Sequence, residues 1–370
     1  MNFDPHMTFL RIFLLPLAAL YGVAVWIRNL FFDLGLLPSK GYAVPVINIG
    51  NLSTGGTGKS PHVEYLIELL AGQFNIAVLS RGYGRNTKGF MQVLPTHKAM
   101  EVGDEPLMFI TKHPHIVVAV SEKRTHGIEE IQKRFPEVNL ILLDDAFQHR
   151  FVKPSLNILL TEYHRPFMED WILPLGNLRE SKNEASRADV LIVTKTPGIF
   201  PIMARKHFLE RLQPYEFKQV FFSTIQYGKW IHIRNGASGA SDEVNHSTIY
   251  LVTGIAHTYI LEEYLKRKCT TLIVNKYKDH HQFREEDLQK VRTEFGNLIG
   301  TQKVIVMTEK DYVRIKESNL ENIIADLPVF IVPIKVVFHK NCSRQFDDFI
   351  KSFLKNRVID VAQPIAADNC

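Results

Sequence analysis

From about residue 43 onward, short apolar runs alternate with longer stretches in which apolar and polar residues recur with helical spacing. Several of these runs are apolar without interruption, as expected for strands that are covered on both faces of a mostly parallel sheet. Polar or glycine-containing turns follow their C-terminal ends, where open α/β sheets place ligands. The pattern predicts an α/β fold whose first strands lie at residues 43–49, 76–79, 116–120, 140–143, 156–160 and 190–193.

A second β-rich block follows after about Pro214, with predicted strands at residues 220–224, 248–252, 271–274, 304–307 and 329–332. Residues 233–246 are rich in Gly, Ser and Asn and predict a loop near the boundary between the blocks. We therefore expect two α/β lobes with a cleft between them. The expected division is an N-terminal helix (1–38), a first lobe (39–225), a second, smaller lobe (226–345), and a C-terminal helix and tail (346–370).

The N-terminal segment is apolar from Ile12 to Ile27 and is bounded by Arg11 and Arg28. A cleaved signal peptide would need a small-residue cleavage site, which the residues after Arg28 do not offer. A transmembrane helix needs roughly 20 apolar residues, whereas this run is shorter and is interrupted by Pro16. An interfacial helix suits the length and the aromatic residues, so we expect membrane contact of that kind. A true span and a buried core helix are the alternatives.

The composition changes this picture little. The chain has 370 residues, of which 45% are hydrophobic and 22% charged, and this is typical of a globular protein large enough for two domains. A formal net charge of +5 fits an anionic partner such as a phosphate, a nucleotide or a lipid headgroup. The excess is too small and scattered to indicate nucleic acid. The three cysteines form no CxxC pair, which argues against a disulfide framework or a cysteine zinc site.

A glycine-rich loop carries the clearest chemical signal. The strand predicted to end at Ile49 runs into GNLSTGGTGKS, and a helical pattern follows. Glycines allow backbone N–H groups to turn onto phosphate oxygens, and the helix start adds its positive dipole end. Lys59 can reach the β and γ phosphates, and the Ser60 hydroxyl can ligate magnesium. We predict a P-loop, with Ser53 in place of its first glycine, whose nucleotide-binding residues are Ser53, Thr54, Gly55, Gly56, Thr57, Gly58, Lys59 and Ser60.

A P-loop also needs a carboxylate for magnesium, usually at the end of another strand. The apolar run 140–143 ends in Asp144 and Asp145, at the same expected sheet edge, so one of them should join Ser60 at Mg²⁺. Guanine-specific P-loop proteins use an Asn/Thr-Lys-x-Asp strand end. Residues 194–197 lack the aspartate and residues 308–311 have the wrong spacing, which favours ATP.

Two further loops could hold an acceptor or offset charge on a transferring phosphoryl group. Arg81 and Arg85 surround a glycine-bearing loop that suits a substrate phosphate, and the alternative is a solvated turn. Asp104 and Glu105 open a predicted helix, where they could supply a catalytic base or simply complement the helix dipole.

Two more polar clusters lie further along the chain. Residues 173–180 end in an Arg–Glu pair that is either structural or part of an active site. Residues 279–283 place two histidines beside an aspartate, as in a proton relay, a metal site or a polar loop. No HExxH accompanies them, so a dedicated zinc site is the least favoured of the three.

The motifs occur in the order GNLSTGGTGKSP (50–61), SRGYGR (80–85), VGDEP (102–106), LLDDAFQHR (142–150), LPLGNLRE (173–180), DHHQF (279–283) and TEKD (308–311). Together they resemble the tetraacyldisaccharide 4'-kinase family of lipid A biosynthesis over roughly residues 8 to 340. DDAFQHR with GGTGKSP and SRGYGR makes the resemblance specific, and Ser53 is then a family trait. One departure is His257, where the family pattern would have asparagine.

The resemblance implies a P-loop NTPase-like, mostly parallel sheet with a second, smaller α/β lobe and an N-terminal membrane-associated helix. It implies transfer of the ATP γ-phosphate to the 4'-hydroxyl of a tetraacyl disaccharide 1-phosphate. Asp104 would be the base, tuned by His280, while Lys59 stabilises the γ-phosphate and Ser60 with Asp144 or Asp145 organises Mg²⁺. The expected substrate residues are Arg81 and Arg85 from the glycine-bearing loop and Glu105, Arg124, Gln148, His149, Arg179 and Glu180 from the resemblance.

An acylated substrate binds the bilayer strongly, since each buried methylene is worth about 0.8 kcal/mol. The expected partners are therefore this lipid and the cytoplasmic face of the inner membrane, with no nucleic acid and no obligate protein partner. We also hypothesise that lobe closure brings His280 toward Asp104 when both substrates are bound. The rival hypotheses are a membrane-associated P-loop ATPase switch without a transfer substrate and a non-catalytic nucleotide-binding scaffold. The density of charged motifs beside the P-loop argues against both.

Overall fold

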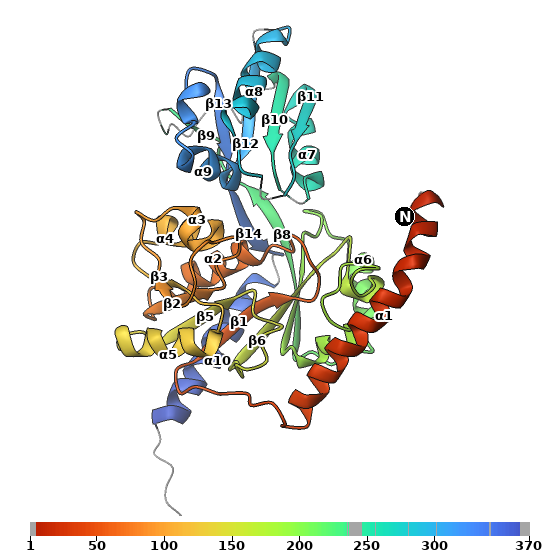
Figure 1. The fold of residues 1–370 in the computed structure, drawn as a ribbon, viewed down its shortest axis with the longest axis vertical. Coiled ribbons are helices and arrows are strands. Elements are labelled where there is room, and N and C mark those ends of the chain that lie inside the picture. Colours follow the sequence, from red (N-terminus) through yellow and green to blue (C-terminus); the bar gives the residue numbers. More distant parts are fainter. Residues whose placement is uncertain are drawn as a thin grey trace, which may run out of the picture.

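The computed structural model describes residues 5–234, 236, 246–255, 257–279, 281–300, 302–339 and 342–362. The chain forms two lobes, each built around its own sheet (Figure 1). His280, expected to tune the base, lies outside the described residues.

The first lobe contains the larger sheet. Its strands are β1 (Val46–Asn51), β2 (Ile76–Ser80), β3 (Met91–Gln92), β4 (Val117–Val120), β5 (Leu140–Asp144), β6 (Leu156–Glu162), β7 (Val190–Thr194), β8 (Gln219–Tyr227) and β14 (Ile334–Phe338). They lie in the order β14-β8-β7-β6-β1-β5-β2-β4-β3, and only the edge strands β14 and β3 pair antiparallel. Every residue of β1, β2, β5, β6 and β7 is buried, as parallel strands covered on both faces should be. The apolar runs in the sequence therefore identified the central strands.

Helices of the first lobe cover this sheet (Figure 1). They are α2 (Lys59–Leu70), α3 (Ala99–Val102), α4 (Asp104–Lys112), α5 (Arg124–Arg134), α6 (Ile202–Arg211) and α10 (Ser343–Ala362), with short turns of 3₁₀ helix, η1 (Phe167–Glu169) and η2 (Lys182–Arg187). The apolar face of α2, including Val63, Leu66 and Leu70, packs in one core with Ile47 and Ile49 of β1. This packing fixes α2 directly behind the loop that follows β1.

The second lobe has a five-stranded sheet in the order β11-β10-β12-β13-β9. Its strands are β9 (Ile231–His232), β10 (His246–Thr253), β11 (Cys269–Lys276), β12 (Lys303–Thr308) and β13 (Val329–Val332), and its helices are α7 (Tyr259–Lys266), α8 (Glu285–Asn297), α9 (Glu309–Glu317) and the short η4 (Glu321–Ile323). Apolar clusters on the two faces of this sheet give the lobe a core of its own. Helix α9 begins where β12 ends, at the side of the lobe that faces the first lobe (Figure 1).

The chain returns to the first lobe at its C-terminal end. Strand β14 falls in the range expected for the second lobe (226–345), yet it pairs with β8 at the edge of the first sheet. Phe346, Ile350 and Leu354 of α10 then pack into the core of the first lobe. Strands β8 and β14 together form the two-stranded connection between the lobes (Figure 1). The expected boundaries at 225 and 345 stay predictions.

Helix α1 (Pro5–Asp33) runs along one side of the first lobe (Figure 1). It continues through Pro16, so the expectation that this proline interrupts the run was wrong: the helix has 29 residues, and residues 13–33 are long and apolar enough to cross a membrane. One side is anchored by Phe32 against the Phe151 ring and by Arg150, which donates to the Asn29 carbonyl oxygen at 3.1 Å. Most of the apolar segment is exposed, with 11% of it buried, which does not fit a core helix.

Candidate active site

Residues of both lobes enclose a cleft of about 720 Å³. Its wall includes the P-loop, the strand ends at Ser80 and Asp144, and Lys310 at the start of α9. Tyr21, Val25 and Arg28 of α1 also line it, so the cleft reaches from the P-loop to the N-terminal helix. The cleft predicted between the two lobes is present.

The loop that precedes α2 has the backbone geometry of a phosphate cradle. Gly55 and Gly58 have φ angles of 101° and 92°, a left-handed conformation that glycine adopts without strain. Gly58 is the N-cap of α2, so the free N–H groups of the helix start face the loop. Two side chains hold the loop: Thr194 donates to the Thr57 carbonyl oxygen at 2.9 Å, and Lys195 donates to that of Gly56. The predicted P-loop is therefore preformed.

Ser53 lies at the entrance of this loop. It forms an isolated antiparallel bridge with Leu178, and the N–H of Thr54 donates to the Asn177 carbonyl oxygen at 2.8 Å. The motif at residues 173–180 thus lies beside the P-loop, with Arg179 and Glu180 at its end. Glu180 is buried and pairs with Arg187 and, at 3.6 Å, with Arg28 of α1.

Lys59, Arg179 and Asp145 form a connected charged group. The ammonium of Lys59 is 3.5 Å from Asp145 Oδ2, and Arg179 is 2.8 Å from Asp145 Oδ1. Burial acts to raise the pKa of Asp145, but the two cations outweigh it and lower that pKa. Asp145 is therefore an ionised carboxylate that is already paired.

Asp144, the last residue of β5, has a different environment. Its Oδ2 accepts from the Ser80 hydroxyl at 3.2 Å, while Oδ1 is buried with no hydrogen-bond partner among the described residues. Burial, with the nearby charges of Glu105 and Asp145, raises the pKa of Asp144 to about 7. A buried, unsatisfied carboxylate oxygen near a P-loop serine is the arrangement that a divalent cation would satisfy.

The donor set fits Mg²⁺ of the P-loop kind. Within the described residues, no three His, Cys, Asp or Glu side chains gather as a metal cluster. Mg²⁺ in kinases does not need such a cage, because it takes one or two protein oxygens together with phosphate oxygens and water. Ser60 and Asp144 offer those protein oxygens.

The acidic pair at the start of α4 lies at the junction of the lobes. Gly103, with φ 94°, caps α4, and Asp104 and Glu105 are its first two residues. Glu105 Oε1 accepts from the Ser60 hydroxyl and from Lys310 Nζ, the latter at 2.7 Å. Burial would raise the pKa of Glu105, but Lys310 and Ser60 outweigh it and lower the pKa to about 2.

Asp104 lies beside the cleft wall with 15% of its side chain exposed, and its Oδ2 is 2.8 Å from Nε of Arg314. Both Arg314 and Lys310 belong to α9 of the second lobe. Residues from the two lobes therefore meet at the two carboxylates that open α4.

The remaining predicted substrate residues divide into two groups. Arg81, Gln148 and His149 line the cleft together with Arg179 and Glu180. Burial and the nearby Arg124 lower the pKa of His149 to about 4, so this histidine is neutral. The Gln148 amide donates to the Asn51 carbonyl oxygen at 2.9 Å, which ties the cleft floor to β1.

Arg124 and Arg85 lie elsewhere. Arg124 is buried beneath the strand ends, where it donates to the carbonyl oxygens of Ser121 at 2.6 Å and Asp144 at 3.2 Å. Burial lowers its pKa to about 10. The side chain of Arg85 is only 2% exposed and pairs with Glu122. In this structure both arginines brace loops next to the cleft.

The DHHQF motif is split by the fold. Asp279 lines the cleft, whereas His281 pairs with Asp287 at 2.9 Å and stacks on the Tyr277 ring. His257, the departure from the family pattern, lies next to the P-loop. If Gly55 were replaced by a residue with a Cβ, that atom would lie 3.4 Å from Nε2 of His257.

Two residues of this site, Lys310 and Arg314, were missed from the sequence. The TEKD motif was noted only for its family resemblance and its failure as a guanine signature. The available signal was their spacing, because cations at positions i and i+4 after a strand end lie on one face of the following helix.

Comparison with known proteins gives a consistent result. A family model described as tetraacyldisaccharide-1-P 4'-kinase matches residues 10–353. The tetraacyldisaccharide 4'-kinase of Bacteroides thetaiotaomicron is 40% identical over 362 residues, which cover 95% of each chain. That of Flavobacterium psychrophilum is 42% identical over 353 residues, 95% of this chain and 98% of its own.

Among solved structures, LpxK from Aquifex aeolicus in complex with ATP matches with a TM-score of 0.68 and 27% identity. The match covers 93% of this chain and 99% of that one. The predicted fold class and the family resemblance are both confirmed.

Proposed function

The chain belongs to the tetraacyldisaccharide-1-P 4'-kinase family, and on that premise we propose how its residues divide the work of the reaction. The protein is an ATP-dependent kinase that transfers the γ-phosphate to the 4'-hydroxyl of tetraacyldisaccharide 1-phosphate in lipid A biosynthesis.

One observation carries the proposal: a single cleft is lined by the P-loop, by Glu105 beside Asp104, and by Tyr21, Val25 and Arg28 of α1. Such a cleft brings a nucleotide and a membrane-bound acceptor to the same place. Transfer of a phosphoryl group depends mainly on this positioning and on electrostatic stabilisation, because little covalent chemistry is left to the protein.

The P-loop amides and Lys59 bind the β and γ phosphates of ATP. Lys59 contacts Asp145 at 3.5 Å, and the incoming phosphate offers its ammonium a second anionic partner. Arg179 keeps Asp145 paired at 2.8 Å during that exchange. Magnesium bound in this site would supply positive charge that offsets the charge of the phosphates.

Ser60 and Asp144 would hold Mg²⁺. Asp144 is the better ligand of the two neighbouring aspartates, because one of its buried oxygens has no partner among the described residues while Asp145 is already paired with two cations. Asp145 then orients Lys59 and Arg179 instead of contacting Mg²⁺.

Asp104 accepts the proton of the 4'-hydroxyl. It lies at the N-terminus of α4, where the helix dipole favours its ionised form, and 15% of its side chain remains exposed to an approaching hydroxyl. Arg81 and the neutral His149 line the cleft and contact the sugar and phosphate groups of the acceptor.

The lipid enters the cleft directly from the membrane to which α1 binds. Phe13, Leu17, Leu20 and Trp26 are exposed on α1 and insert among the acyl chains, while Arg28 stays at the level of the headgroups. The enzyme works on the cytoplasmic face of the inner membrane, where ATP is available.

Calorimetric titration of Mg²⁺ in the presence of a non-hydrolysable ATP analogue tests the metal assignment. Asp144→Asn should raise the half-saturating Mg²⁺ concentration by at least about 10-fold, as expected for loss of a direct ligand. Asp145→Asn should raise it clearly less than Asp144→Asn does, because Asp145 is already paired with Lys59 and Arg179. The exposed Asp348→Asn on α10 serves as the control. The reverse order for the two aspartates would transfer the ligand role to Asp145.

A further inference from the structure

We propose that Arg314 is a positioning residue for Asp104, and that helix α9 thereby makes the second lobe part of the acceptor site. This inference rests on the proposed role of Asp104 as the base. It adds a residue that acts through that carboxylate and comes from the opposite lobe.

The guanidinium of Arg314 is held from several directions. Only 1% of its side chain is exposed, and its Nε donates to Asp104 Oδ2 at 2.8 Å. Its Nη1 donates to the carbonyl oxygen of Gly254 and to Oδ1 of Asp311, both at 3.3 Å. A side chain held at both Nε and one terminal nitrogen has little rotational freedom, so it can fix the group that it binds.

Asp311, which supports Arg314, is itself fully buried and anchored in the second lobe. It accepts hydrogen bonds from the Thr253 hydroxyl at 3.0 Å, the Gly254 N–H at 3.0 Å and the Thr308 hydroxyl at 2.7 Å. These partners lie at or next to the ends of β10 and β12, which pair with each other in the second sheet. The position of Arg314 therefore follows the position of the whole lobe.

Helix α9 meets α4 at two points. Lys310 and Arg314 are four residues apart and lie on the same face of α9. Lys310 pairs with Glu105 at 2.7 Å, and Arg314 pairs with the adjacent Asp104 at 2.8 Å. Two parallel ion pairs fix both the distance and the rotation of α9 relative to the start of α4, which a single pair would not do.

A carboxylate that accepts a hydrogen bond from a guanidinium shares its negative charge with that cation, which makes it a weaker base. This cost is acceptable in phosphoryl transfer, because the transition state is loose and depends more on the orientation of the acceptor than on strong proton abstraction. An error of about 1 Å in such an orientation can reduce a rate about 100-fold. Orientation of Asp104 is therefore what Arg314 contributes.

A double-mutant cycle on the single-turnover transfer rate tests this role. Arg314→Gln alone should lower the rate about 30-fold or more, while the Kd of a non-hydrolysable ATP analogue changes less than about 3-fold. In an Asp104→Asn background, the same substitution should lower the rate less than about 3-fold, because its target is already gone. Equal losses in both backgrounds would overturn the inference and leave the role of Asp104 intact.

The two hypotheses fail separately. If Asp104→Asn itself keeps the wild-type rate, the assignment of the base is wrong, whatever Arg314 does. If Arg314→Gln does not fold, as judged by thermal unfolding, the same cycle is measured with Arg314→Lys. That variant keeps a cation in the site but lacks the planar guanidinium. It should lower the transfer rate about 10-fold when Asp104 is present, and it should have no such effect in the Asp104→Asn background.

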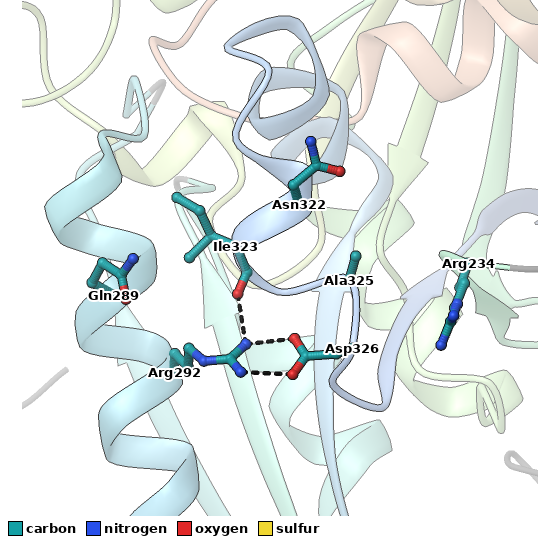
Figure 2. A pocket seen from close by; sticks show the side chains of 7 residues that line it. All are labelled: Arg234, Gln289, Arg292, Asn322, Ile323, Ala325 and Asp326. Atoms are coloured by element: carbon teal, nitrogen blue, oxygen red, sulfur yellow. Dashed lines mark hydrogen bonds and ion pairs between the residues drawn. The ribbon is translucent and has the colours of Figure 1, made fainter.

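Arg292→Gln is the matched control (Figure 2). Arg292 also belongs to the second lobe and pairs through both terminal nitrogens with Asp326, at 2.5 and 2.6 Å, and with the Ile323 carbonyl oxygen at 2.9 Å. It lines a separate pocket of about 450 Å³ that, among the described residues, shares none with the cleft. Its loss should leave the transfer rate unchanged.

Discussion

The ammonium of Lys310 lies 2.7 Å from Oε1 of Glu105, and this ion pair joins the second lobe to the helix that opens with the acidic pair. The same ammonium is 3.3 Å from the hydroxyl of Ser60, the proposed magnesium ligand. A cation from the second lobe therefore lies next to the proposed metal site.

Replacing Lys310 with Met removes a positive charge that repels a divalent cation at Ser60, so the half-saturating Mg²⁺ concentration for ATP-analogue binding should fall about 3- to 10-fold. Isothermal titration calorimetry measures the effect. Lys316→Met, on the exposed part of the same helix, should have no effect. A rise in the Mg²⁺ requirement would show that Lys310 supports the metal site instead.

Lys59 should matter for the transfer step. Its ammonium is held by Asn51 at 3.3 Å and by Asp145 at 3.5 Å, which places it in advance of the reaction. Loss of one such prepositioned donor typically costs about 100-fold or more in rate. Rapid-quench measurement should show this loss for Lys59→Met, and none for the surface variant Lys218→Met. A Lys59→Met enzyme within 3-fold of wild type would contradict the P-loop assignment.

Acid should destabilise the protein partly through His62. Its Nδ1 donates to the Gly58 carbonyl oxygen at 2.7 Å, its Nε2 accepts from the Ser223 hydroxyl at 3.0 Å, and burial lowers its pKa from 6.5 to about 4. Between these values the unfolded chain binds more protons than the folded one. The free energy of unfolding should therefore fall as the pH drops from 6.5 to 4, by up to about 3 kcal/mol from this group.

Urea unfolding at several pH values checks the contribution of His62. His62→Gln should flatten the dependence between pH 6.5 and 4, on top of any slope that the similarly shifted His149 supplies. His207→Gln, at an exposed position of α6, should leave the slope as it is. An unchanged slope in His62→Gln would mean that this histidine is not neutral in the folded protein.

Membrane binding should depend on the exposed side of α1. Burial of one leucine side chain is worth about 1.5–3 kcal/mol, so Leu20→Gln should weaken binding to anionic lipid vesicles about 10-fold or more. Sedimentation with the vesicles measures this directly. Ile299→Gln removes an even more exposed apolar residue from the second lobe and should not change binding. Equal losses for both variants would indicate unspecific adsorption.

Much of the fold could be predicted from the sequence because the central strands are continuous apolar runs. Every residue of β5 is buried, and its run at 140–143 was recognised as a strand. The return of the chain at β14 was not recognised. This strand alternates, with Val336 and Phe338 buried and Lys335 exposed, and its partner β8 precedes it by more than 100 residues. No local pattern reveals such a distant pairing.

The candidate site shows the same limit. The P-loop and Asp144 were predictable because their chemistry lies in contiguous residues that follow strands. Lys310 and Arg314 are about 200 positions from Glu105 and Asp104 in the sequence. They contact these carboxylates only because the two lobes pack against each other. Arg85 was expected at a substrate phosphate because a glycine-bearing loop surrounds it, yet the structure turns it toward Glu122.

The most direct test of this account is phosphate transfer from labelled ATP to tetraacyldisaccharide 1-phosphate in detergent micelles, with wild type and Asp104→Asn compared at saturating ATP and Mg²⁺. We predict labelled lipid from the wild type and a loss of about 100-fold or more in the variant, as general-base catalysis commonly contributes 10²–10⁴-fold, with the ATP analogue bound equally well by both. Labelled lipid formed at the wild-type rate by Asp104→Asn would contradict the account, because the acceptor proton would then be taken by another group.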